Sequence, residues 1–177
     1  MARRSRGALA AEELASLKYR SVAGTAFLCA LLRDIGKLAL NVGIGERYTQ
    51  LVAQHTGDVR SFVEAERAAM GFDHAQLGAA MARKWGLPPE VADAIEHHHA
   101  PPAGHVSPLT DLVHAADAVC RWMGPGVGTD GMEYTFDAGV QNRLGIDRQR
   151  VEAVVLAVFC RLKDIERPKD TSNGVAA

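Results

Sequence analysis

The chain has 177 residues, of which 47% are apolar and 23% are charged, and its formal net charge is -1. This length and composition are typical of one globular domain whose core needs neither a disulfide nor a structural metal. The balanced charge argues against nucleic-acid and acidic-membrane partners, and without an apolar run of roughly 20 residues or a signal region the expected compartment is the cytoplasm.

The first two predicted helices cover residues 5–20 and 22–40. The second contains the run Ala26–Leu32, which has no polar face. A helix that is apolar all round belongs in the middle of a core. We therefore expect residues 22–40 to form the most buried element of the fold.

Two opposite charges, Arg33 and Asp34, follow this apolar run, and Gly36 comes shortly after them. Buried charges are costly unless they are paired or bound to a metal. Arg33 and Asp34 therefore need partners from elsewhere in the chain.

Two short helices are expected over residues 46–54 and 59–70, and a third begins after them at a capping box formed by Asp73 and Gln76. The capping box places His74 in the first turn of the third helix. The predicted apolar face of that helix is Leu77, Ala80, Met81 and Trp85.

The next helix begins at Pro89. Its predicted buried stripe is Val91, Ala94, Ile95 and His98. Three adjacent histidines also occur at solvated helix ends, but an imidazole in line with a buried stripe is a better metal-ligand candidate than most. His99 lies four residues after Ile95 and can also turn inward.

Ser107 and Pro108 have the residue types of another helix start. The core face of this helix is apolar, and Asp117 falls at its edge. A half-buried aspartate among apolar neighbours requires a hydrogen-bond donor or a cation. His114 projects further out and is expected at the surface.

The C-terminal part is predicted to contain a glycine-rich loop over residues 124–139, a last helix capped by Asp147, and a disordered tail over residues 167–177. The core face of the last helix is predicted to be Val151, Val154, Val155, Val158, Leu162 and Ile165. The three cysteines are far apart and are expected to be small core residues: Cys29, Cys120 and Cys160.

Nearly every predicted element is helical and the sequence has no convincing strand pattern, so the expected fold class is all-α. Acid and histidine candidates come from separate helices, as in bundles that gather a metal site from facing helices. The order of the segments around them resembles the HD superfamily of metal-dependent phosphohydrolases and, within it, the HDOD domain, a signalling relative of the HD-GYP phosphodiesterases. The segments that carry this resemblance are Leu31–Leu38, Glu64–Arg67, Gly71–Gly78, Trp85–Pro101 and Val113–Ala118.

The resemblance covers roughly residues 4–123 and implies an HD-type helical bundle. HDOD domains usually carry an N-terminal helical subdomain that has no counterpart here. We therefore expect residues 1–166 to form a single HD-like domain, equivalent to the C-terminal half of a full HDOD module. The metal ligands that the resemblance implies are Asp34, His74, His98, His99 and Asp117.

Two positions depart from the superfamily pattern. Arg33 stands where the family has the histidine of its His-Asp pair, and Arg4 aligns with the early histidine of the superfamily. A guanidinium has five donors, no acceptor and a pKa above 12, so it cannot ligate a metal. We therefore expect a vestigial metal site with no catalytic residue and no cofactor.

Three functions are compatible with this residue set. The favoured one is a non-catalytic signalling domain that binds a protein partner or forms a homo-oligomer. The second is a working phosphohydrolase, with iron, manganese, nickel or zinc on the five implied ligands. The third is a sensor that binds an anionic nucleotide without cleaving it, through Arg4, Arg33 and Lys37, although these cations are equally suited to ion pairs within the bundle.

Asp34 and Asp117 would repel one another in a pocket that lacks a metal. We therefore expect an arginine to replace the metal and to pair with one of these carboxylates, with Arg33 as the first candidate and Arg4 as the second.

Overall fold

The computed structural model describes residues 2–54, 59–102, 104, 107–123 and 137–166. All regular elements in these ranges are helical, which confirms the all-α prediction, and no described helix is both long and apolar enough to cross a bilayer. The elements are α1 Ala2–Lys18, η1 Arg20–Val22, α2 Ala23–Leu32, α3 Ile35–Ile44, α4 Glu46–Gln54, α5 Val59–Met70, α6 His74–Lys84, α7 Pro89–Glu96, α8 Pro108–Trp122, α9 Ala138–Leu144 and α10 Arg148–Glu166. The predicted tail and most of the predicted 124–139 loop lie outside the described residues.

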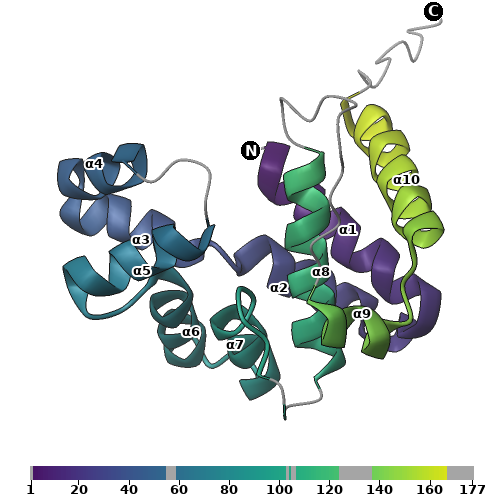
Figure 1. Ribbon diagram of the computed structural model, residues 1–177, viewed down its shortest axis with the longest axis horizontal. Coiled ribbons are helices and arrows are strands. Elements are labelled where there is room, and N and C mark those ends of the chain that lie inside the picture. Colours follow the sequence, from purple (N-terminus) through teal and green to yellow (C-terminus); the bar gives the residue numbers. More distant parts are fainter. Residues whose placement is uncertain (1, 55–58, 103, 105–106, 124–136, 167–177) are drawn as a thin grey trace, which may run out of the picture.

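Helix α8 is the central element of the bundle. It packs against α1, α2, α7 and α9, and Figure 1 shows it between the α3–α5 group on one side and α10 on the other. Ser107 caps its start by accepting a hydrogen bond from the Thr110 N–H, as the sequence predicted. Eleven of its 15 residues are buried. The centre of the core therefore lies at residues 108–122.

The prediction that residues 22–40 form the most buried element is wrong. In α2 only Ala26, Cys29 and Ala30 are buried, whereas Leu28 is 37% exposed. Phe27 packs only partly buried against the core. The buried residues of α2 are small and the larger apolar ones stay at least partly exposed, so the apolar run does not distinguish a central helix from one that buries only a narrow face.

The predicted single helix over residues 22–40 is also wrong, because it breaks at the two charges. Helix α2 ends at Leu32, Asp34 leaves helical geometry with φ -98° and ψ 16°, and α3 starts at Ile35. Helix α3 then continues to Ile44 and ends at Gly45, whose φ is 48°. The break lets α2 pack with α1 and α8 while α3 packs against α6. It places Arg33 and Asp34 where these groups of helices meet.

The face of α6 that packs inward differs from the predicted one. Ala80 and Trp85 are exposed, and Trp85 retains 54% of its accessible surface. The buried residues are His74, Ala75, Gly78, Ala79 and Ala82. Helix α6 therefore uses its small residues, which permit close approach, rather than its bulky ones.

Two predicted core residues of the last helix lie at the surface. Cys160 is exposed, whereas Cys29 and Cys120 are buried as predicted. Ile165 is 69% exposed in the last turn of α10, because the apolar stripe extends past the part of the helix that packs. Val151, Val154 and Val158 are buried, and Val155 and Leu162 pack partly buried against the same core.

Two glycines allow α3 and α6 to cross in backbone contact. A Cβ on Gly36 would lie 2.8 Å from the His74 carbonyl carbon and 3.0 Å from the Gly78 nitrogen. A Cβ on Gly78 would lie 3.2 Å from Ile35 Cγ2. This contact fixes the start of α6, and therefore His74, beside the turn that carries Asp34.

Gly36→Ala is expected to destabilise the fold by about 3 kcal/mol, the upper end of the usual cost of overpacking, since the blocking atoms belong to the backbone and cannot rotate away. Gly43→Ala in the same helix is the matched control, because a Cβ there meets nothing within 4 Å. The control should be neutral or stabilising by up to about 1 kcal/mol. Urea unfolding of both variants measures the difference, and equal midpoints would show that the α3–α6 contact is looser than described.

Candidate functional site

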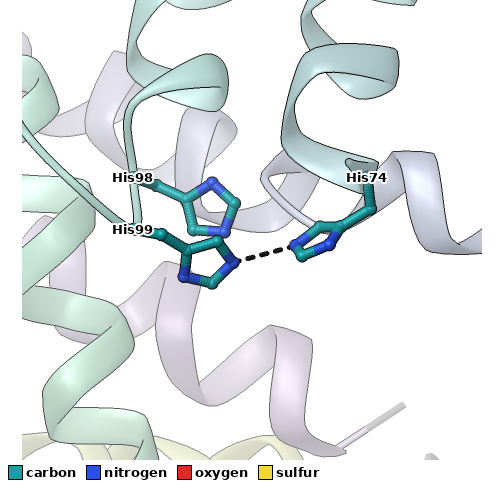
Figure 2. A group of neighbouring side chains, drawn as sticks. All are labelled: His74, His98 and His99. Atoms are coloured by element: carbon teal, nitrogen blue, oxygen red, sulfur yellow. Dashed lines mark hydrogen bonds between the residues drawn. The ribbon is translucent and has the colours of Figure 1, made fainter. Parts of the chain in front are cut away.

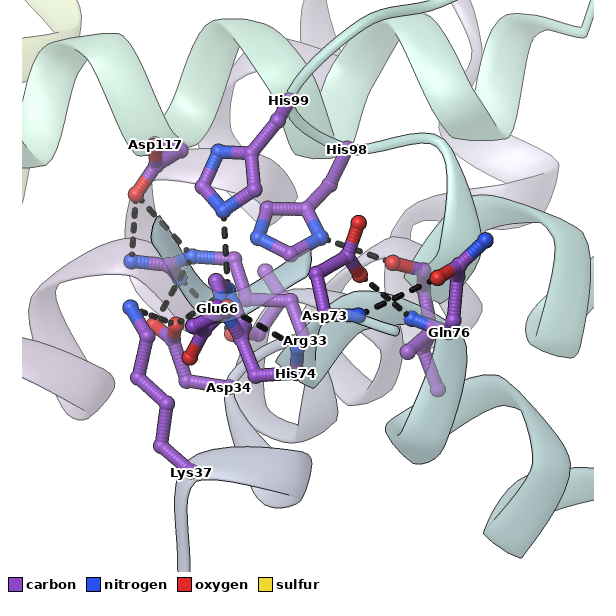
Figure 3. Close-up of polar contacts among 12 residues, drawn as sticks. Arg33, Asp34, Lys37, Glu66, Asp73, His74, Gln76, His98, His99 and Asp117 are labelled. Carbon is purple, nitrogen blue, oxygen red and sulfur yellow. Dashed lines mark hydrogen bonds and ion pairs between the residues drawn. The ribbon is translucent and has the colours of Figure 1, made fainter. Parts of the chain in front are cut away.

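Side chains that the sequence proposed as ligands lie together at the junction of several helices (Figure 3). Asp34 precedes α3, His74 begins α6, and Asp117 belongs to α8. His98 and His99 follow the end of α7. His74 Nε2 lies 3.6 Å from Asp34 Oδ1 and 2.9 Å from His99 Nε2.

The position of His74 is set by local hydrogen bonds at the start of α6. The Asp73 carboxylate accepts from the Gln76 N–H at 2.8 Å, and the Gln76 side chain accepts from the Asp73 N–H at 3.1 Å. Arg67 forms an ion pair with the same Asp73 carboxylate at 2.6 Å. The predicted capping box is therefore present and begins the helix at His74.

The three imidazoles form a compact cluster (Figure 2). Each of His74, His98 and His99 offers a ring nitrogen, and these nitrogens lie within 4.8 Å of one another. The rings of His98 and His99 are 3.8 Å apart between centroids. His74 and His98 are completely buried. The cluster is therefore an internal group of nitrogens rather than a solvated helix end.

His98 presents an unprotonated ring nitrogen, Nε2, to this cluster. Its Nδ1 lies 2.7 Å from the Ile95 carbonyl, which can only accept, so Nδ1 carries the proton. Burial lowers the pKa of His98 to about 4, so the ring is neutral near pH 7. Nε2 is buried and has no hydrogen-bond partner among the described residues. Its lone pair is therefore available to a ligand.

His99 is held neutral for a similar reason. Burial lowers the pKa of His99, and the neighbouring His98 and His74 rings lower it further. His114, which the sequence placed at the surface, is instead partly buried, and its Nδ1 lies 2.8 Å from the His98 carbonyl. His114 therefore fixes the backbone from which the cluster projects.

Arg33 is a buried charged side chain of the site, with 1% of its surface exposed. Its Nε donates to Asp117 Oδ1 at 3.1 Å, and its Nη2 lies 3.0 Å from the same oxygen. Its Nη1 donates to the Ala30 carbonyl at 2.8 Å. Gly7 of α1 leaves the necessary space, since a Cβ there would lie 3.0 Å from the Arg33 Cζ.

The protein's own cations neutralise both carboxylates of the site. Burial favours the protonated form of Asp117, but Arg33 and Arg121 reverse this effect and lower the pKa of Asp117. Asp34 is partly buried, and Lys37, whose Nζ lies 2.6 Å away, and Arg33 hold the pKa of Asp34 well below its usual range. Both carboxylates are therefore ionised and paired, as Figure 3 shows.

Three participating residues were not assigned a role from the sequence. Glu66 is completely buried and bonds to His74, and the Tyr48 hydroxyl donates to Glu66 at 2.6 Å. Arg121 pairs with Asp117. Glu66 and Tyr48 lie on the two short helices expected over residues 46–54 and 59–70, and only the position of Glu66 within the family-like segment Glu64–Arg67 could have pointed to it. The side chain of Arg4 lies outside the described residues.

The described residues fit part of an HD-type metal centre. The ring nitrogens of His74 and His99 and the Nε2 lone pair of His98 suit a zinc, iron or nickel ion. Asp34 and Asp117 do not fit, because Lys37 and Arg33 already neutralise them. Arg33 also places a fixed positive charge beside the cluster, which opposes a divalent cation.

The chain matches a known domain family over more than half of its length. The HDOD domain model matches residues 2–101. A stretch of 60 residues, which is 34% of this chain and 10% of the relative, is 42% identical to ribonuclease Y of Deinococcus radiodurans.

Solved structures share the fold at low sequence identity. A presumed phosphohydrolase from Shewanella amazonensis has a TM-score of 0.68 at 20% identity over 89% of this chain and 57% of its own. An HDOD domain protein from Geobacter sulfurreducens has a TM-score of 0.65 at 21% identity, covering 93% and 59% respectively. The MmoQ response regulator from Methylococcus capsulatus has a TM-score of 0.62 at 19% identity, covering 86% and 59%. The chain therefore spans well under two thirds of the length of these relatives.

Arg33→Met is expected to destabilise the protein by about 3–5 kcal/mol, because it leaves Asp117 buried without its main partner. Arg83→Met is the matched control, since Arg83 is half exposed and pairs with Asp93 and Glu96 at the surface. The control should cost no more than about 1 kcal/mol. Denaturant unfolding at low salt measures both, and a similar small cost for the two variants would show that the Arg33 pair is not buried in solution.

Stability should fall as the pH drops from about 6.5 towards 4. The pKa of His98 is about 4 in the folded state and ordinarily about 6.5, so only the unfolded chain gains this proton over that range. The contribution is fully present above pH 6.5, and up to about 3 kcal/mol is lost below it. His98→Asn, which can still donate to the Ile95 carbonyl, should flatten the profile of unfolding free energy against pH. If the slope of unfolding free energy against pH is the same in His98→Asn and the wild type, His98 is not held neutral by burial.

Proposed function

Because this chain belongs to the HDOD domain family, we propose that it is a non-catalytic regulatory domain. It acts through contact with a signalling protein, a second copy of itself or a bound ligand, and it does not hydrolyse phosphoesters. The compartment that suits this role is the cytoplasm.

The buried Arg33–Asp117 ion pair is the observation that carries this proposal. The HD superfamily, which this chain resembles, has a metal-binding histidine at the position of Arg33. A guanidinium has no lone pair to donate, and here it engages Asp117 at 3.0 Å. The Lys37 ammonium group forms an ion pair with Asp34 at 2.6 Å. The carboxylates that would hold metal ions and activate water therefore already have partners.

The comparisons give this proposal further support. One structural relative is named as a response regulator and another as an HDOD domain protein. Both share only the fold with this chain, at 19% and 21% identity. A signalling role for the chain is thus consistent with the kinds of protein that use this bundle.

A metal-dependent phosphohydrolase is the second candidate, and the histidine cluster favours it. His74, His98 and His99 could hold one metal ion, which would supply a Lewis acid for a phosphoryl oxygen or a bound water. The nucleotide-sensor alternative has less support, because Arg33 and Lys37, its proposed phosphate ligands, are both paired with carboxylates.

The purified protein should show no turnover of a phosphodiester such as bis(p-nitrophenyl) phosphate with added manganese, iron, nickel or zinc. The comparison is with Asp34→Ala, prepared in the same way, which measures contaminating hydrolases. Equal rates for the two proteins are expected. A wild-type rate at least about tenfold above that of Asp34→Ala would reject the proposal in favour of the hydrolase.

A further inference from the structure

A buried hydrogen-bond chain connects the histidine cluster to helices α4 and α5. The Tyr48 hydroxyl donates to Glu66 Oε1 at 2.6 Å. Glu66 Oε2 accepts from the His74 backbone N–H at 3.0 Å and lies 2.5 Å from His74 Nδ1. Tyr48 is the one buried residue of α4, and Glu66 is completely buried on α5.

The chemistry of Glu66 decides which nitrogen of His74 carries a proton. Both oxygens of Glu66 already accept hydrogen bonds, Oε1 from the Tyr48 hydroxyl and Oε2 from the His74 backbone N–H. A carboxylate whose two oxygens both serve as acceptors accepts from the ring as well, so His74 Nδ1 donates. In the neutral ring the lone pair is then on Nε2, which faces His99 at 2.9 Å and Asp34 at 3.6 Å.

His74 differs in this respect from its neighbour in the cluster. The Nδ1 proton of His98 is fixed by the Ile95 carbonyl, three residues earlier in the same segment. The Nδ1 proton of His74 is fixed by a side chain from another helix, which is itself held by a third helix. The Phe62 ring of α5 packs beside both ends of this chain, with centroids 6.3 Å from Tyr48 and 6.0 Å from His74.

We propose that Glu66 and Tyr48 are positioning residues of the histidine cluster, which hold the lone pair of His74 Nε2 towards His99 and Asp34. Helices α4 and α5 thereby set which nitrogen of His74 is offered to a ligand. This inference rests on the proposed function of the chain as a regulatory domain that acts through a bound ligand.

The test measures the protonated nitrogens of the histidine rings directly, by ¹H–¹⁵N NMR of the full chain labelled with ¹⁵N-histidine and with no ligand added. In the wild type the neutral His74 ring should carry its proton on Nδ1. A neutral ring with the proton on Nε2 would overturn the proposal without any variant. Because hydrolysis is not measured, this outcome is distinct from failure of the proposed function.

Glu66→Leu removes both acceptor oxygens and replaces the side chain with one of similar size. It should lower the fraction of His74 with Nδ1 protonated by at least about twofold. Glu66→Gln should restore it, since its carbonyl oxygen can accept from His74 and its amide can donate to the Tyr48 oxygen. His98 and His114, whose Nδ1 atoms face backbone carbonyls, serve as internal controls for folding. A folded Glu66→Leu protein with an unchanged His74 ring would overturn the role of Glu66.

Tyr48→Phe removes only the hydroxyl and keeps the ring in the core. It should speed solvent exchange of the His74 Nδ1 proton by about tenfold, as expected for the loss of one buried hydrogen bond to a charged group. Exchange at His98 should stay within about twofold of the wild type. An unchanged rate at His74 would remove Tyr48 from the chain of positioning contacts. This arm remains informative if Glu66→Leu does not fold.

Discussion

The central constraint on this molecule is a guanidinium buried where several helices meet. A charged group with 1% exposure must find its partners inside the protein, and Arg33 finds Asp117 and the Ala30 carbonyl. The surroundings are arranged for it: the helix breaks at its position, and Gly7 leaves room for its end. Such a pair is weak evidence for added stability, but losing either partner would leave an uncompensated charge.

The ion pair divides the site into two halves with different properties. In the acidic half, Asp34 and Asp117 are ionised and matched by Lys37 and Arg33. In the imidazole half, the buried His98 Nε2 has no hydrogen-bond partner within the described part of the chain. A metal centre with the five ligands that the resemblance implies would need both halves, but the carboxylates of the acidic half are already paired. This division is the physical basis for proposing regulation rather than catalysis.

The fold class, the helix starts at Asp73 and Ser107, and the buried stripe that ends at His98 could be predicted because local chemistry and periodicity decide them. The break at Arg33–Asp34 and the central position of α8 could not, because tertiary packing decides them. Glu66 escaped notice because its role depends on a contact with His74, eight residues away and on another helix. The identity of the candidate ligands could be proposed from the sequence, but their charge states follow only from the observed pairs.

Titration with manganese(II), a cation that prefers carboxylate ligands, tests the central claim most directly. If Arg33 excludes metal from the acidic half, the wild type should bind manganese weakly, and Arg33→His should bind it at least about tenfold more tightly. Arg83→His, which changes a surface arginine, should behave as the wild type. Wild-type affinity equal to that of Arg33→His would contradict the account, because it would show that the guanidinium does not take the place of a metal.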